Sequence, residues 1–305
     1  MSNLLWLPGP MEGVMSPEWV RAANSLALTD RWITPFFRLS QELPRRKYFA
    51  AFLQPYKPVP TVMQLMGTDA GLLAEAACIA EAEGAVGVDF NFGCPSSQVL
   101  RHGAGGGILK APALAGRIVR RTLAAVKIPV SVKIRCGWED PAELPLLLDQ
   151  LLEEPPDMLT LHFRCVKEGY LPVDPAERER RFRMAAEKIT GRCPLILNGD
   201  FNTAEDMRSA VIRHHAAGAM AARGFLRDPG LLCRAAGLEV PPAEILRERF
   251  FRAVIAQYPE GMPPGRAIEM SIFLWGKDNP YFQCLRGRRD PVSITDVPPC
   301  SEASC

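Results

Sequence analysis

Residues 88–96 read Val-Asp-Phe-Asn-Phe-Gly-Cys-Pro-Ser, a short apolar strand that stops at Asn91 and gives way to a loop. The loop carries the thiol of Cys94, followed by Pro95. Proline donates no ladder hydrogen bond, so the strand cannot continue through it as a strand interior. Residues 103–107 then read Gly-Ala-Gly-Gly-Gly, a run that lets the backbone approach a neighbour closely. We interpret this region as a buried strand with a reactive loop at its carboxyl end.

The same pattern of a short apolar strand followed by a helix recurs along the chain. The predicted strands are residues 4–7, 27–30 (a weak signal), 61–65, 88–92, 129–135, 158–162, 194–198 and 218–222. Strands that are apolar on both faces are typical of parallel sheets, and their spacing is roughly the 30 residues of a βα unit. Eight such units predict a closed (β/α)8 TIM barrel. An open doubly wound sheet is the alternative, but it would carry a GxGxxG turn after its first strand, and none is present.

The pattern changes after Pro229, where helical stretches follow one another without strands between them. We therefore predict an α/β barrel in residues 1–238 and a small C-terminal all-helical domain in residues 239–292. Residues 293–305 are polar and are expected to form a flexible tail.

The composition is that of an ordinary globular protein, with 48% hydrophobic and 23% charged residues among 305. No apolar run approaches the roughly 20 residues that span a bilayer, and the N-terminus does not resemble a signal peptide, so we expect a cytoplasmic protein. The nine cysteines are scattered, without the spacing of a zinc site, so we expect reduced thiols and no metal. The net charge of +2 is not evidence for or against nucleic-acid binding.

Polar or reactive residues end seven of the eight predicted strands. Active sites of barrels form at these ends, because the loops that follow the strands meet there. One polar strand end would be uninformative, whereas a run of them predicts a site in the barrel mouth. The residues are Pro10, Met11, Glu12, Gln64, Asn91, Cys94, Lys133, Arg135, His162, Arg164, Asn198, Gly199, Asp200, Arg223 and Gly224.

The last two strand ends predict a phosphate site. The loops after the seventh and eighth strands form the usual phosphate site of barrels. Gly199 and Gly224 permit close approach, and the guanidinium of Arg223 can bind a phosphate through two hydrogen bonds. The alternative is a pair of tight turns with one surface arginine.

Lys133 lies inside an apolar strand, and a buried lysine requires a partner or a function. It can face the edge of a flavin ring and stabilise the anionic reduced form, or it can pair with a carboxylate such as Asp89. Gln64 can bind the same ring or pair within the barrel mouth. His162 is either a satisfied core histidine or, with Arg164 two residues on, part of the site.

Cys94 has two chemical roles open to it. As a nucleophile it would require a neighbouring base. As a general acid it would require a protonated thiol, which is the ordinary form of cysteine at neutral pH. No cation adjoins Cys94 in the sequence, which favours the acid. A third interpretation, an inert buried thiol, fits poorly with a position at the start of a loop.

These residues resemble the tRNA-dihydrouridine synthase family, most closely its bacterial C-type branch. The pairing of the Asn-x-Gly-Cys-Pro motif at 91–95 with Lys133 is its most specific part. The matching stretches occur in family order, at residues 10–13, 33–38, 62–65, 88–96, 103–107, 130–135, 162–164, 167–170, 198–200 and 223–224.

The resemblance implies an FMN-binding barrel followed by a helical domain that grips tRNA. FMN would be recharged by NADPH and would pass hydride to C6 of a uracil, while Cys94 would protonate C5 to give 5,6-dihydrouridine. The C-type branch implies position 16 of the D-loop as the target. Such a base must leave the tRNA stack to enter a barrel mouth.

The resemblance also implies individual roles. Asn91, Arg135 and Arg164 would contact the target uridine. The residues that would hold FMN are Pro10, Met11, Glu12, Gln64, Lys133, His162, Asn198, Gly199, Asp200, Ala222, Arg223 and Gly224.

The chain departs from the family pattern at three places. Residues 96–98 read Ser-Ser-Gln where a basic residue is usual, Cys165 replaces a threonine, and an Asp-Trp pair is missing near Asp174. Two other functions therefore stay open, a flavin barrel that reduces a free small molecule such as a pyrimidine and a degenerate tRNA-binding protein without turnover. For each we expect a monomer.

Overall fold

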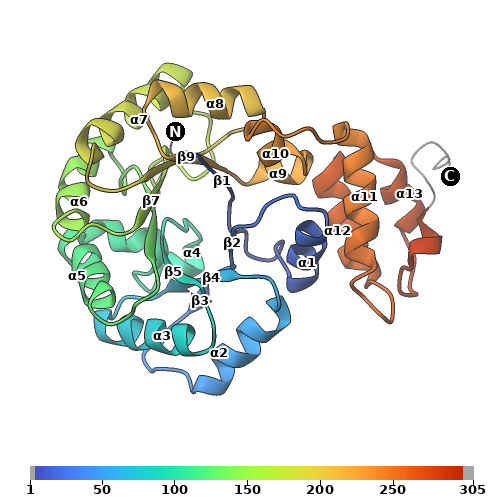
Figure 1. Ribbon diagram of the computed structural model, residues 1–305, viewed down its shortest axis with the longest axis horizontal. Coiled ribbons are helices and arrows are strands. Elements are labelled where there is room, and N and C mark those ends of the chain that lie inside the picture. The colour runs from blue at the N-terminus through green and yellow to red at the C-terminus, as the bar shows by residue number, and fades with distance from the viewer. Residues whose placement is uncertain (1–3, 298–305) are drawn as a thin grey trace.

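The computed structural model describes residues 4–297, which form a barrel of parallel strands with a group of helices at one side (Figure 1). The strand order is β1-β9-β8-β7-β6-β5-β4-β2, and β3 also pairs with β4. β2 lies beside β1, so the ring is nearly closed and the predicted (β/α)8 TIM barrel is confirmed. The strands are β1 (Leu5–Pro8), β2 (Trp32–Ile33), β3 (Phe37–Arg38), β4 (Thr61–Met66), β5 (Gly87–Phe92), β6 (Val130–Arg135), β7 (Met158–His162), β8 (Leu195–Asn198) and β9 (Gly218–Ala221).

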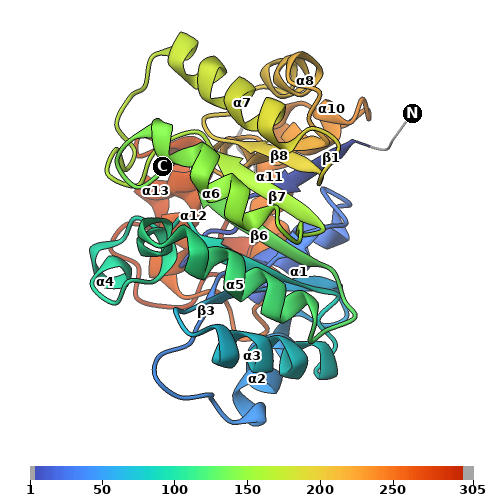
Figure 2. The same ribbon diagram turned by 90° about the vertical axis from the view of Figure 1, so that its left-hand side faces the viewer.

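Helices surround the barrel, and Figure 2 shows α5, α6 and α7 as a layer outside β6 and β7. The helices of the barrel part are α1 (Pro17–Ser25), α2 (Arg46–Leu53), α3 (Ala70–Ala82), α4 (Ser97–Leu100), α5 (Pro112–Leu123), α6 (Leu144–Leu151), α7 (Pro175–Ile189), α8 (Ala204–Arg213), α9 (Arg223–Arg227) and α10 (Leu231–Ala235). A 3-10 helix, η2 (Gly105–Lys110), begins within the glycine run.

Side-chain caps start several of these helices. Ser16 accepts the N–H of Trp19 before Pro17, and Asp69 accepts two N–H groups at the start of α3. Thr203 accepts the N–H of Asp206 in α8. These oxygens satisfy donors that have no partner within the first helical turn.

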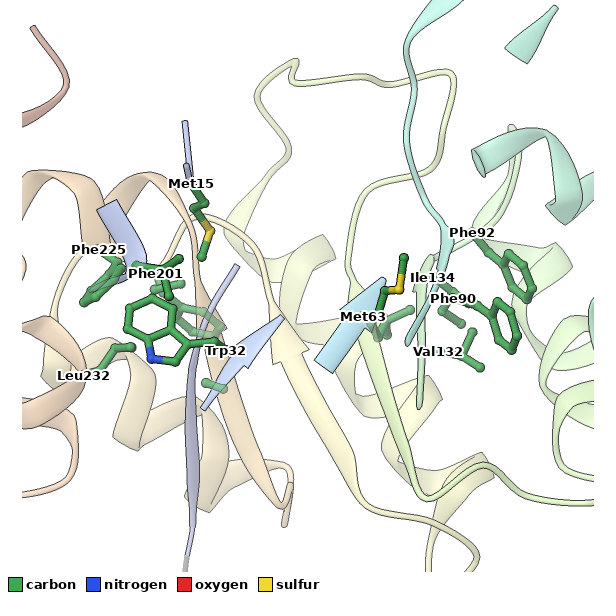
Figure 3. Close-up of a cluster of buried hydrophobic side chains, with 14 of the residues drawn as sticks. Met15, Trp32, Met63, Phe90, Phe92, Val132, Ile134, Phe201, Phe225 and Leu232 are labelled. Atoms are coloured by element: carbon green, nitrogen blue, oxygen red, sulfur yellow. The ribbon is translucent and has the colours of Figure 1, made fainter. Parts of the chain in front are cut away.

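Alternate strand residues face opposite sides of the barrel wall. The outward residues pack under the helices, and Figure 3 shows Met63, Phe90, Phe92, Val132 and Ile134 fully buried there. The inward residues Leu7, Ile33, Ile196 and Met220 form a separate apolar cluster. This cluster fills the lower part of the barrel, so the polar inward residues gather above it, at the carboxyl ends of the strands.

The predicted strand at residues 27–30 is wrong. Ala27 has a φ of 53°, and its N–H bonds to the carbonyl of Asn24, while Leu28 bonds back to Ala23. These residues therefore form the turn that ends α1. The strand occurs just afterwards as β2, whose pairing with β4 involves residues distant in the sequence.

The C-terminal helices pack directly on the barrel. They are α11 (Ala243–Ile255), α12 (Pro264–Trp275) and α13 (Pro280–Leu285), the last of which we did not predict. Trp19 of α1 lies edge-on to Phe250 of α11, with ring centroids 5.0 Å apart, and to Phe225 of α9 at 5.5 Å. The two parts thus share an aromatic core. Within the predicted tail, Ile294–Asp296 form a short 3-10 turn, and residues 298–305 lie outside the described residues.

The cysteines follow the prediction in part. Six of those in the described chain are free thiols, whereas Cys284 is disulfide-bonded, so the expectation of reduced thiols is wrong at that position. No described helix combines the length and the apolar character that a membrane crossing requires. Within residues 4–297, no group of three or more histidine, cysteine or acidic side chains is arranged to hold a metal ion.

Candidate functional site

A cavity of about 570 Å³ opens at the carboxyl ends of the barrel strands. This volume lies within the roughly 300–1,000 Å³ of small-molecule sites. Every predicted site residue except Arg164 lines the cavity. These residues are Pro10, Met11, Glu12, Gln64, Asn91, Cys94, Lys133, Arg135, His162, Asn198, Gly199, Asp200, Ala222, Arg223 and Gly224.

The loop that carries Cys94 is held by the side chain of Asn91. The Oδ1 atom of Asn91 accepts the N–H of Gly93 at 3.1 Å and the N–H of Cys94 at 2.9 Å. Asn91 is the last inward residue of β5, so the strand itself orients the loop. The thiol is consequently presented at the cavity wall.

The glycine run packs against the same loop. The carbonyl of Cys94 accepts the N–H of Gly106 at 3.0 Å. Gly105 has a φ of +56°, and a Cβ there would lie 2.7 Å from Val99 and 3.0 Å from the Cβ of Cys94. Only a residue without a side chain allows this approach. The run therefore supports Cys94 from behind.

A buried carboxylate lies below the cavity on β5. Asp89 is 0% exposed, and its two oxygens accept hydrogen bonds from Gln64 at 2.7 Å and Ser131 at 2.6 Å. Burial raises the pKa of Asp89, against the hydrogen bonds from Ser131 and Gln64 and the charge of Lys133. Gln64 in turn accepts from the Nδ2 of Asn91 at 3.0 Å. The pairing of Gln64 within the barrel mouth, one of its two predicted roles, is thus present.

Lys133 adjoins Asn91 across the β5–β6 ladder and lines the cavity. Burial and the nearby Arg135 lower the pKa of Lys133 to about 8, while Asp89 and Cys94 act in the opposite direction. Gln64 and Ser131 each donate to one oxygen of Asp89, and Lys133 acts on that carboxylate through its charge.

Arg135 and Arg164 make different contacts. Arg135 lines the cavity, and its guanidinium donates to the carbonyls of Gly93, Cys165 and Gly169. Arg164 is 3% exposed and pairs with Asp200, which lines the cavity. Of the predicted substrate contacts, Arg164 is the one that does not line the cavity.

Asp200 connects Arg164 to Arg223, the arginine of the predicted phosphate site. Its other oxygen accepts from Arg223 at 2.7 Å. Burial raises the pKa of Asp200, but the two guanidinium groups outweigh burial, and the pKa lies below its usual value. Gly199 allows the turn, with a φ of +124° and the ring of Phe163 where a Cβ would stand.

The environment of His162 favours its neutral form. Burial lowers its pKa well below the usual value, and Arg135, Lys133, Arg164 and Arg223 lower it further. Its Nδ1 accepts the N–H of Arg164 at 3.3 Å. A neutral imidazole that accepts at Nδ1 carries its proton on Nε2, so His162 can donate one hydrogen bond to a ligand.

Four aromatic residues of the cavity had no predicted role, namely Phe36, Tyr170, Phe201 and Phe273. Tyr170 is 64% exposed, and the guanidinium groups of Arg135 and Arg223 lie 5.5 and 5.4 Å from its ring. It stands in the matched stretch 167–170, which was the available signal. Phe273 reaches the cavity from α12, and no local pattern in the sequence indicates that contact.

Residues 7–259 match the family profile described as Dihydrouridine synthase (Dus). The chain belongs to this family. It is 33% identical to the tRNA-dihydrouridine(16) synthase of Vibrio cholerae, over 73% of this chain and 71% of that protein. It is 30% identical to the protein of the same name from Pseudomonas syringae, over 97% of this chain and 98% of that protein. The corresponding protein of Vibrio vulnificus is 32% identical over 73% and 72%. The predicted family membership is confirmed.

Proposed function

We propose that the chain is an FMN-dependent tRNA-dihydrouridine synthase that reduces a uridine in tRNA, at position 16 of the D-loop, with electrons from NADPH. Similarity to the Pseudomonas syringae relative over nearly the whole of both chains supports the position. The observation that carries the proposal is the meeting of Cys94, Asn91, Lys133 and Arg135 at one cavity. These residues come from two adjacent strands and the loops that follow them.

The cavity suits a phosphate-bearing cofactor such as FMN. Lys133, Arg135 and Arg223 surround it with positive charge, and His162 adds a neutral donor. Gly199 stands in the loop after β8 and Gly224 in the first turn of α9, where the phosphate of a barrel ligand usually lies. The full set that we propose to hold FMN is Pro10, Met11, Glu12, Gln64, Lys133, His162, Asn198, Gly199, Asp200, Ala222, Arg223 and Gly224. A reduced flavin bound there would supply the hydride.

The protein's own contribution is to place the base and deliver a proton. Cys94 would donate its thiol proton to C5 of the uracil, from a loop fixed by Asn91 and the glycine run. Asn91 and Arg135 would hold the base. Arg164 would act through Asp200, since it does not line the cavity. Residues 239–292 would grip the tRNA body.

The decisive experiment measures dihydrouridine by mass spectrometry in tRNA from cells that lack this protein. We expect one dihydrouridine, at position 16, to disappear and to return with the wild-type gene. Complementation with Cys94→Ala should fail although the purified variant still binds flavin. A tRNA with unchanged dihydrouridine, or full activity of Cys94→Ala, would contradict the proposal.

Reduction of a free pyrimidine is tested with the whole chain. Phe273 of α12 lines the cavity, so deletion of the helical part would damage the site itself. Purified protein should therefore be assayed with tRNA and with free uridine. Turnover of free uridine alone would favour the small-molecule enzyme, and tRNA binding without turnover or flavin would favour the degenerate binding protein.

A further inference from the structure

A continuous chain of hydrogen bonds joins a buried carboxylate to the Cys94 loop. Gln64 donates from Nε2 to Asp89, and Asn91 donates from Nδ2 to the Oε1 of Gln64. Asn91 then accepts the N–H groups of Gly93 and Cys94. Asp89 is 0% exposed and does not line the cavity, whereas Gln64, Asn91 and Cys94 do.

The carboxylate of Asp89 at one end of this hydrogen-bond chain and the loop N–H groups at the other end orient the carboxamides of Gln64 and Asn91 in the same sense. Backbone N–H groups can only donate, so Asn91 must turn its oxygen to the loop and its amide nitrogen to Gln64. Gln64 must then present its oxygen to Asn91 and its nitrogen to Asp89. An ionised carboxylate only accepts, which agrees with that direction.

The direction limits what Asn91 can offer to a ligand. Its Oδ1 already accepts two hydrogen bonds, which uses both lone pairs. Its Nδ2 donates one hydrogen to Gln64 and has one hydrogen left. Asn91 therefore presents a donor and no acceptor to the cavity.

We propose that Asp89 is a positioning residue, which orients Gln64 and, together with the N–H groups of the loop, holds Asn91 as a hydrogen-bond donor that selects a ring carbonyl in the substrate. The choice of a uracil carbonyl rests on the proposed function, whereas the direction of the chain does not. A carbonyl next to Asn91 gains a partner, while an exocyclic amine would face a second donor. Uracil has carbonyls at C2 and C4, and cytosine carries an amine at C4.

Exchanging the side chains at positions 89 and 91 tests the direction of the hydrogen-bond chain. In Asn91→Asp, the oxygen that replaces Nδ2 faces the side-chain oxygen of Gln64. Turning the carboxamide of Gln64 over would remove this clash but would direct its oxygen at Asp89. This variant should lose stability because acceptors face each other in a buried place. Asp89→Asn should lose little, because the new amide can keep its oxygen toward Gln64 and donate to Ser131, which also lies 3.5 Å from the carbonyl of Val88.

The double variant Asp89→Asn, Asn91→Asp can reverse the whole chain. The new amide at position 89 donates to Gln64, which donates to the new carboxylate at position 91, which still accepts from the loop. We expect the melting temperature of Asn91→Asp to fall by several degrees, on the order of 5 °C, and to recover by more than half in the double variant. If the changes in melting temperature caused by the two substitutions were additive, the proposal would be overturned.

The same melting temperatures measured in a Gln64→Met background distinguish the effect of the hydrogen-bond chain from direct charge repulsion between positions 89 and 91. Without the carboxamide the recovery should vanish, and recovery that persists would also overturn the proposal. The double variant should not regain reduction of uridine, because position 91 then lacks a donor, and regained activity would refute the donor role. If the wild-type protein reduces no uridine, the proposed function fails. The stability measurements still test the direction of the hydrogen-bond chain.

Discussion

Gly105 shows how closely single residues support the Cys94 loop. Its φ is +56°, and a Cβ would meet Val99 at 2.7 Å and Cys94 at 3.0 Å. We expect Gly105→Ala to lower the free energy of unfolding by roughly 1–3 kcal/mol and to displace the thiol. Urea denaturation and assay of dihydrouridine formation measure the two effects.

Gly107→Ala is the matched control, because the nearest heavy atom would lie 3.9 Å from the new Cβ. We expect its free energy of unfolding to change by no more than about 0.5 kcal/mol. Equal losses in the two variants would contradict this account of the glycine run.

The charge of Lys133 predicts a dependence of stability on pH. Burial lowers its pKa to about 8 in the folded protein, against roughly 10.4 in an unfolded chain. Between these values the unfolded state binds more protons, so the stability of the ligand-free protein due to this residue rises with pH. Lys133→Met lacks this contribution.

Urea denaturation of both proteins from pH 7 to pH 10.5 measures the effect. The free energy of unfolding of the wild type should rise relative to Lys133→Met above about pH 8, by a few kcal/mol at most. A difference that stays constant across this range would show that the lysine is not desolvated in the folded state.

At the scale of elements, closure of the barrel depends on the contact between β1 and β9. Gly218 pairs with Leu5, and a Cβ on Gly218 would lie 1.9 Å from the carbonyl oxygen of Leu5. We expect Gly218→Ala to cost more than about 3 kcal/mol, because backbone rather than a flexible side chain must move. Thermal unfolding followed by circular dichroism measures the loss.

Gly265→Ala in the first turn of α12 is the opposite case. No heavy atom lies within 4 Å of its new Cβ, so the change should stabilise by up to about 1 kcal/mol through helix propensity. A melting temperature that falls as far as in Gly218→Ala would refute the steric explanation.

At the scale of the whole molecule, the barrel and the C-terminal helices share one core. Phe250 is 0% exposed and contacts Trp19 of the barrel part. We expect the described chain to unfold in one transition, and Phe250→Ala to lower the stability of both parts together by roughly 3–5 kcal/mol. Circular dichroism and tryptophan fluorescence, recorded in the same scan, report on both parts.

Ile245→Ala on the same helix is the control, because Ile245 is 47% exposed. Its effect should stay below about 1 kcal/mol. Two separate transitions, with only the later residues affected by Phe250→Ala, would instead support an independently folding domain at residues 239–292.

The sequence by itself determined the barrel and the position of most site residues. The apolar strands and the caps Ser16, Asp69 and Thr203 are local signals, because strand burial and helix capping depend on neighbouring residues. Strand ends also meet at one end of a parallel barrel whatever the details of packing. The cavity therefore contains nearly all of the residues that the strand ends predict.

Only the tertiary structure decided how these residues are used. The sequence did not indicate that Arg164 pairs with Asp200, that Asp89 orients Gln64, or that Phe273 reaches the cavity. Each of these contacts joins residues far apart in the chain, so its geometry depends on the register and packing of whole elements. The role of Asn91 changed for the same reason, because the hydrogen bonds around it leave only a donor free.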